Sequence, residues 1–142
     1  MEQRVSLITL GVRDADAVAA FYEKLGWARV ETQDGVIAFD LLGQTLGLYP
    51  LEKLAEDIGI DMAQLGHGSM TLGYNTRSRE EVDAVMAHVS DAGGTVLKDA
   101  QEVFWGGYHG YFSDPEGHIW EVAHNPFSPL RHDDNAFRWT GY

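Results

Sequence analysis

One glutamate has the sequence context of a side chain that does acid–base chemistry on a small molecule. Glu121 lies in Ile119–His124, which alternates like a half-buried strand. Alternation places Glu121 on the face opposite Trp120 and Val122, which suit burial under a helix. A carboxylate in partly apolar surroundings is expected to have a raised pKa and to act as a general base. The alternative is a glutamate that accepts hydrogen bonds from a neighbouring tyrosine or histidine and is chemically idle.

Two histidines are candidates for the surroundings of Glu121. His67 lies two residues before Ser69, at the start of a predicted strand, so both side chains fall on one face. His67 and Glu121, with His109, would supply a partial facial set of metal ligands. A histidine near a strand start is, however, more often a surface residue.

Aromatic residues and glycines alternate densely over residues 103–112. Glycine lets a ligand approach the backbone, and aromatic rings offer flat surfaces with polar tips. We predict Trp105 and Tyr108 as a ligand-binding wall, with His109 beside them and Tyr49 closing the other end. The pattern also fits a hairpin whose aromatic side chains fill the core, and alternation allows both. A wall of this kind favours a planar guest.

The elements that position these residues occur twice along the chain. Each half begins with a predicted strand that contains Thr-Leu-Gly, at residues 9–11 and 71–73. A predicted helix that contains Asp-Ala-Val follows in each half, at residues 16–18 and 83–85. In each half, apolar runs separated by turn residues then predict three strands. In the first half, the first of these strands is Trp27–Glu31. The order is therefore βαβββ, twice.

Two βαβββ modules in one chain predict an α+β fold. Each helix covers one face of its sheet, and the two open faces would together form a concave trough suited to a small molecule. We place the modules at about residues 4–50 and 68–126 of a domain over residues 1–126, with a short helical insert at 51–67. A tail over residues 127–142 either docks on its own domain or packs on a second subunit.

The composition excludes several classes of protein. The 142 residues include 22 acidic and 10 basic side chains, for a net charge of −12. Phosphate backbones and anionic lipid repel such a chain, so we expect neither nucleic acid nor a membrane as a partner, and the charge favours a cationic guest. The chain has no apolar stretch long enough to cross a membrane, no visible secretory signal and no cysteine. We therefore expect a cytoplasmic protein without disulfides.

Several motifs resemble the vicinal oxygen chelate superfamily, which groups glyoxalase I, bleomycin-resistance proteins and extradiol dioxygenases. They are Thr9–Asp14, Phe21–Trp27, Tyr111–Val122 and the following Asn125-Pro126. The resemblance covers about residues 4–126. It implies the paired-module fold, a small-molecule site and a homodimer.

Metal-using members of that superfamily carry His, Gln or Glu ligands at four strand positions. Carried over to this sequence, these positions fall on Leu7, Gly47, Ser69 and Glu121. Only Glu121 is a strong ligand, so we expect no metal cofactor. If a divalent ion does bind, we expect Glu121 and His67 to hold it.

Together these features favour a metal-free small-molecule-binding protein of the glyoxalase and bleomycin-resistance type, with a planar or aromatic ligand in the trough. The alternative is a lyase, isomerase or dioxygenase-type enzyme of the same superfamily. Glu121 would then act as a general base or as a ligand of an altered metal site. A regulatory module with a vestigial trough is a third hypothesis. Whether the chain is an enzyme stays open from its sequence.

Overall fold

The chain folds as two compact units, Met1–Ser69 and Met70–Tyr142, each built from one of the two sequence repeats. The computed structural model describes residues 3, 5–30, 36–66, 68 and 70–141. The helical insert belongs to the first unit and the C-terminal tail to the second. Both units combine helices with a mixed sheet, which confirms the predicted α+β class.

The first unit has a three-stranded sheet in the order β1-β3-β2. Strands β1 and β3 are parallel, and β2 and β3 are antiparallel. Its elements are β1 (Leu7–Val12), α1 (Ala15–Lys24), β2 (Ile37–Leu41), β3 (Gln44–Pro50), α2 (Leu51–Ile58) and a 3-10 turn at Met62–Gln64.

Helix α1 supplies the core of the first unit. Asp14 caps it by accepting a hydrogen bond from the Ala17 N–H at 2.9 Å. Phe21 and Tyr22 are almost fully buried, and the Tyr22 ring meets Phe39 of β2 edge-on at 5.8 Å. The face of this sheet under α1 is therefore the apolar one.

The strand predicted at Trp27–Glu31 is wrong over Trp27–Arg29, which are irregular. Val30 makes a single antiparallel bridge to Ala38, and Glu31 lies outside the described residues. The Trp27 ring stacks on Tyr22 at 4.9 Å, and Arg29 bonds Glu23 of α1 at 2.7 Å. These contacts direct the segment toward the helix, which breaks the alternation that a paired strand requires.

The second unit has a four-stranded sheet in the order β4-β7-β6-β5. Only β4 and β7 are parallel, as β1 and β3 are in the first unit. Its elements are β4 (Leu72–Thr76), α3 (Arg79–Ala92), β5 (Thr95–Glu102), β6 (Tyr108–Ser113) and β7 (Ile119–His124).

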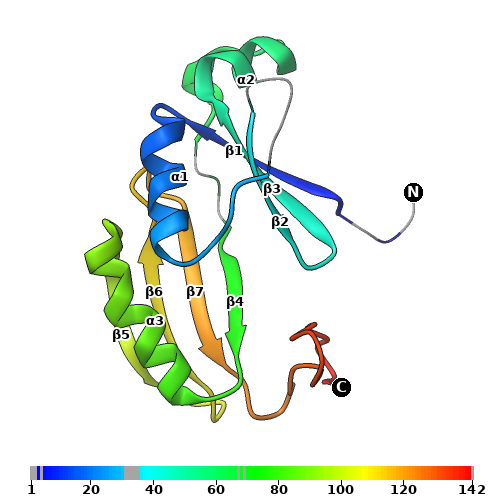
Figure 1. Ribbon diagram of the computed structural model, residues 1–142, viewed down its shortest axis with the longest axis vertical. Coiled ribbons are helices and arrows are strands. Elements are labelled where there is room, and N and C mark those ends of the chain that lie inside the picture. The colour runs from blue at the N-terminus through cyan, green and yellow to red at the C-terminus, as the bar shows by residue number, and fades with distance from the viewer. Residues whose placement is uncertain (1–2, 4, 31–35, 67, 69, 142) are drawn as a thin grey trace. The chain divides into compact units, whose positions relative to one another are not determined.

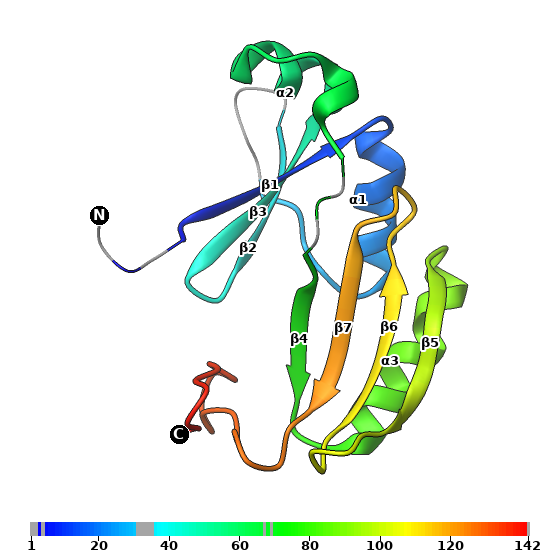
Figure 2. The ribbon, with the colours of Figure 1, turned by 180° about the vertical axis from the view of Figure 1, so that it is seen from behind.

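Helix α3 covers one face of the second sheet; it lies in front of the sheet in Figure 1 and behind it in Figure 2. Val82, Met86 and Val89 form its buried stripe, as the sequence pattern predicts. The Met86 side chain approaches Gly110 so closely that a Cβ there would lie 2.9 Å from Met86 Cε. Because Gly110 belongs to β6, its neighbours His109 and Tyr111 point to the other face.

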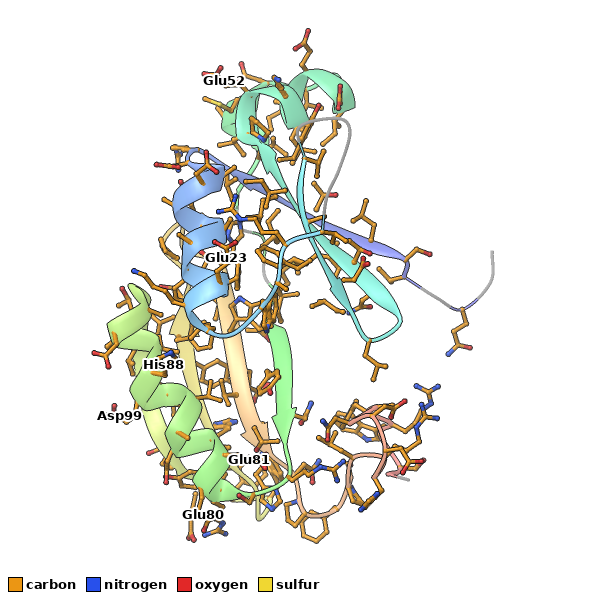
Figure 3. All side chains as sticks on the ribbon, viewed as in Figure 1. Glu23, Glu52, Glu80, Glu81, His88 and Asp99 are labelled. Carbon is orange, nitrogen blue, oxygen red and sulfur yellow. The ribbon has the colours of Figure 1, made fainter. Side chains whose placement is uncertain are left out.

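Acidic side chains gather at the start of α3. Figure 3 shows Glu80 and Glu81 in its first turn, where acidic groups are favourable to the helix dipole. Hydrogen bonds from its own backbone N–H and from the Ser78 hydroxyl lower the pKa of Glu80. The negative charges of Glu80 and Glu81 thus stabilise the start of α3.

The C-terminal tail docks on its own unit. The Arg77 guanidinium, between β4 and α3, donates to the Arg131 and His132 carbonyls at 2.7 and 2.8 Å. The Ser128 hydroxyl donates to the Trp139 carbonyl at 2.6 Å. The Trp139 side chain itself stays exposed, so packing of the tail on a second subunit remains a prediction.

In the described part of the chain, no helix is long and apolar enough to cross a membrane.

Candidate functional site

One face of the second sheet brings together the chemically active side chains of its strands. This face, opposite α3, is called the site face below. The strand registers place Gly73 of β4 beside Glu121 of β7, Glu121 beside Tyr111 of β6, and Tyr111 beside Lys98 of β5. The four positions thus form one row across the sheet.

Glu121 accepts two hydrogen bonds at a single oxygen. Its Oε1 lies 2.7 Å from His109 Nδ1, and the Tyr111 hydroxyl donates to the same atom at 2.9 Å. Its Oε2 accepts no hydrogen bond from any residue that the structure describes. The side chain is 30% exposed. Glu121 therefore has one oxygen fixed by the protein and one that is available to a ligand.

His109 links Glu121 to a lysine. Its Nε2 lies 3.4 Å from Lys98 Nζ, and an ammonium group can only donate. Nε2 must then accept, so the proton of the neutral ring is on Nδ1 and points to Glu121. This buried histidine is held as one tautomer by partners on both sides.

Tyr111 is held as a hydrogen-bond donor. Partial burial raises its pKa, and the hydrogen bond to Glu121 and the charge of that carboxylate raise it further. The phenol is therefore protonated at neutral pH and stabilises the negative Glu121. The surroundings of Glu121 are therefore more polar than the sequence predicts, because two side chains donate hydrogen bonds to its carboxylate.

Trp105 extends the site face beyond the start of β6. Its ring lies directly over Gly107, where a Cβ would be only 1.8 Å from the ring. The Trp105 and His109 rings meet edge-on at 6.4 Å, and the His109 and Tyr111 rings do so at 5.0 Å. The half-buried Trp105 and Tyr111 rings thus lie on either side of the buried His109 and offer flat surface, and Gly107 is needed for the first of them.

Tyr108 lies on the opposite face of the sheet. Its hydroxyl donates to Asp83 of α3 at 2.7 Å, and the Arg79 guanidinium lies 5.6 Å from its ring centroid. Asp83 raises the pKa of Tyr108 through the hydrogen bond. Of the predicted wall, the structure brings Trp105 and His109 together and separates Tyr108 from both.

Of the other two predicted site residues, one belongs to the first unit and the other is not described. Tyr49 belongs to β3 of the first unit, where it pairs with Gly11, and burial together with Asp57 raises its pKa. His67 lies outside the described residues. The site face therefore contains Glu121, His109 and Trp105 of the predicted set.

The ligating side chains of the described residues are scattered. They contain no group of three or more His, Cys, Asp or Glu side chains that could hold one. On the site face, His109 turns one nitrogen to Glu121 and the other to the Lys98 ammonium. Gly47 has no side chain and lies beside Leu7, and Ser69 is not described.

A tight turn fixes the register of Glu121 against Tyr111. Asp114 is buried and accepts hydrogen bonds from the backbone N–H groups of Glu116 and His118 at 3.0 and 2.9 Å. Gly117 follows with φ of +93°, a conformation that favours glycine. The Asp-Pro-Glu-Gly motif thus places β7 so that Glu121 faces away from α3.

Two site residues were missed in the sequence, for different reasons. Tyr111 is two residues from His109 on the same strand, so alternation alone could have placed it beside Glu121. Lys98 comes at the end of a short predicted strand, where a lysine is expected to be a surface residue. Its place depends on irregular pairing of β5 with β6, which leaves no signature in the sequence.

Residues 4–122 match the model of the Glyoxalase/Bleomycin resistance protein/Dioxygenase superfamily, and the chain belongs to this family. This confirms the resemblance drawn from the motifs. No curated protein gives a significant match.

Solved structures show the same fold over nearly the whole chain. A glyoxalase-related enzyme from Fulvimarina pelagi is 37% identical, with a TM-score of 0.89, covering 99% of this chain and 100% of that one. A lactoylglutathione lyase from Agrobacterium tumefaciens is 22% identical, with a TM-score of 0.68, covering 88% and 96%. A hypothetical protein, SA1046, from S. aureus is also 22% identical, with a TM-score of 0.76, covering 88% and 95%. At 22% identity, the last two support the fold alone.

Proposed function

We propose that this chain binds a small planar organic molecule on the site face, with Glu121 Oε2 as the hydrogen-bond acceptor for it. The observation that carries the proposal is that the two carboxylate oxygens of Glu121 have different surroundings. Oε1 accepts from His109 and Tyr111, whereas Oε2 accepts from none of the described residues. A carboxylate oriented by two donors is a preorganised acceptor.

Space and flat surface beside Glu121 support the same proposal. A Cβ at Gly73, across from Glu121, would meet no described atom within 4 Å apart from its chain neighbours. On the other side, the half-buried Tyr111 and Trp105 rings flank the buried His109. A planar ligand can stack on such rings while its donor group reaches Glu121.

A thermal-shift screen of small planar aromatic molecules tests this function, because a ligand that binds the folded state raises the melting temperature. Trp105→Ala should weaken a hit by about 1–3 kcal/mol, the scale of a lost stacking partner. Gly107→Ala should have the same effect, since its Cβ would occupy the place of the Trp105 ring.

Tyr108→Phe is the matched control, because Tyr108 lies on the α3 side of the same strand. It should leave ligand affinity unchanged. Unchanged affinity in both Trp105→Ala and Glu121→Gln would refute the assignment of the site. Metal analysis provides a second check, since about one tightly held divalent ion per chain would overturn the expectation from the sequence that the protein binds no metal cofactor.

A second candidate is an acid–base enzyme, which the short contact between Glu121 and His109 favours. Glu121 Oε2 would take a proton from a carbon beside a carbonyl group, and the electron pair would move onto the carbonyl oxygen. His109 and Tyr111 would hold the other oxygen throughout. The 37% identical structure is described as a glyoxalase-related enzyme, which is consistent with this candidate.

Solvent deuterium incorporation separates the two candidates. An enzyme of this kind should exchange the acidic C–H of small ketones and aldehydes in D₂O, and Glu121→Gln should abolish the exchange. A binding protein should retain its ligand and show no exchange in either form.

A further inference from the structure

Strand β5 pairs irregularly with β6, and the irregularity surrounds one residue. The register shifts between Val96 and Lys98 and again between Lys98 and Gln101. Beta-bulges of this kind bend a strand and re-aim its side chains, and they are over-represented next to active sites.

The first shift decides which face Lys98 occupies. Val96 pairs with Phe112, whereas Lys98 pairs with Tyr111, so the segment from Val96 to Lys98 has one residue more than its partner. In an unbroken ladder, Lys98 and Val96 would share a face. The extra residue moves Lys98 to the face of Tyr111, which is the site face.

Lys98 makes no ion pair with a carboxylate of the described residues. Its Nζ lies 3.4 Å from His109 Nε2 and 5.8 Å from the Tyr111 ring centroid, and no described acidic oxygen lies within 4 Å of it. Lys98 is the only lysine in residues 70–142, in a chain with 22 acidic residues. A lysine that has no ion-pair partner in so acidic a chain is available for an anion from outside.

The donor count leads to the same result. An ammonium group has three N–H donors, and His109 Nε2 can accept only one of them. The side chain is exposed, so its other donors reach solvent or a ligand. A carboxylate or phosphate matches these donors in charge and geometry.

We infer that Lys98 binds an oxyanion group, a carboxylate or a phosphate, of the molecule that occupies the site face. The ligand is then a small planar acid whose anion meets Lys98 and whose donor group meets Glu121 Oε2. This inference rests on the proposed binding function and narrows it. It also reverses the expectation from net charge, because the local cation outweighs a mean charge that water and salt screen.

Three matched probes test the inference, the 3-hydroxy derivatives of benzoate, phenyl phosphate and neutral benzamide, which are called by their parent names below; in each the phenol is the donor for Glu121 Oε2. Binding is followed by the NMR signals of the His109 ring at neutral pH and low salt, with uniformly labelled full-length protein. Wild type should bind the tighter of the two anions about tenfold more strongly than benzamide, the scale of a charge-assisted hydrogen bond. Which anion is tighter distinguishes a carboxylate ligand from a phosphate ligand.

Variants assign the preference to Lys98. Lys98→Met keeps the stem and removes the charge, and it should reduce anion affinity to that of benzamide. Lys98→Arg should restore the preference. Lys53→Met changes the net charge equally, at an exposed position in α2, and should leave the preference intact.

The outcomes separate the inference from the function on which it rests. If benzamide binds in a Trp105-dependent manner and neither anion binds more tightly, the role of Lys98 is refuted and the binding function stands. A preference that survives Lys98→Met also refutes that role. If none of the three probes shifts the His109 signals, both proposals fail. Because Lys98 is exposed, Lys98→Met should fold, which its NMR spectrum in the absence of probes verifies.

Discussion

The two units begin with the same Thr-Leu-Gly strand, yet the two glycines have different surroundings. A Cβ at Gly11 of β1 would lie 2.7 Å from Leu51 Cδ1 and 3.0 Å from Leu54 Cδ2, both of α2. At Gly73 of β4 there is open space among the described residues. Helix α2, which follows β3 directly, therefore covers in the first unit a position that the second unit leaves uncovered.

The strands paired with these glycines differ in the same sense. Gly11 pairs with Tyr49, whereas Gly73 pairs with Glu121. Matching the turn glycines instead equates Glu121 with Gly47, which lies two residues before Tyr49 on the same face. On either alignment the first unit has no carboxylate there. Repetition of an element order thus preserves the scaffold, and the residues on its uncovered face decide what chemistry each copy can do.

The largest effect is expected from the same substitution at both glycines. Gly11→Val should destabilise the protein by about 2 kcal/mol, because the new side chain displaces Leu51 and Leu54 from the sheet. Gly73→Val should change stability by less than about 0.5 kcal/mol, because it enters open space and valine suits a strand. Urea unfolding measures both. Equal losses would contradict the difference in cover.

A smaller effect is expected from shortening a side chain of α2, the helix that covers Gly11. Leu54→Ala should cost about 1 kcal/mol, less than a fully buried leucine, because Leu54 is half-buried between α2 and the sheet. Leu97→Ala, at the exposed bulge of the second unit, should be nearly neutral and serves as the control. The unfolding midpoints should fall in that order, and a neutral Leu54→Ala would remove α2 as a stabilising cover.

The smallest effect concerns the two tyrosines, Tyr111 and Tyr49. A carboxylate raises the pKa of each, since Glu121 faces Tyr111 and Asp57 faces Tyr49. Glu121→Gln should lower the pKa of Tyr111 and leave that of Tyr49 unchanged, and Asp57→Asn should do the reverse. Burial is the larger cause for both, so neither pKa should return to its ordinary value. NMR titration of the tyrosine rings above pH 9 measures the two separately, and a shift of both tyrosines in either variant would show that the sites are coupled.

Most of the fold could be predicted because its signals are local. Cap residues, apolar spacing and turn glycines located α1, α3 and the last two strands, and the repeat gave their order. The prediction at Trp27–Glu31 failed where the aromatic contact of Trp27 with Tyr22 competes with strand pairing. Such a contact links residues across a turn, and alternation in the sequence does not reveal it.

The candidate site also has residues that could be predicted from the sequence and residues that were assigned wrongly. Alternation along β7 was sufficient to turn Glu121 away from Trp120 and Val122, and alternation along β6 would have added Tyr111. The same rule applied to β6 places Tyr108 with α3, where its hydroxyl bonds Asp83. Dense aromatic sequence concealed that division, because both faces of this strand carry rings.

The sequence by itself determined the α+β class, the two repeats, the family and the direction of Glu121, because period-2 and helical patterns act over a few neighbouring residues. Only the tertiary structure decided that Lys98 joins Glu121, since a bulge alters which face a residue occupies without altering its type. It alone also decided that α2 covers Gly11 and that no described residue covers Gly73. Those outcomes depend on packing between elements that are distant along the chain, and no local pattern encodes that packing.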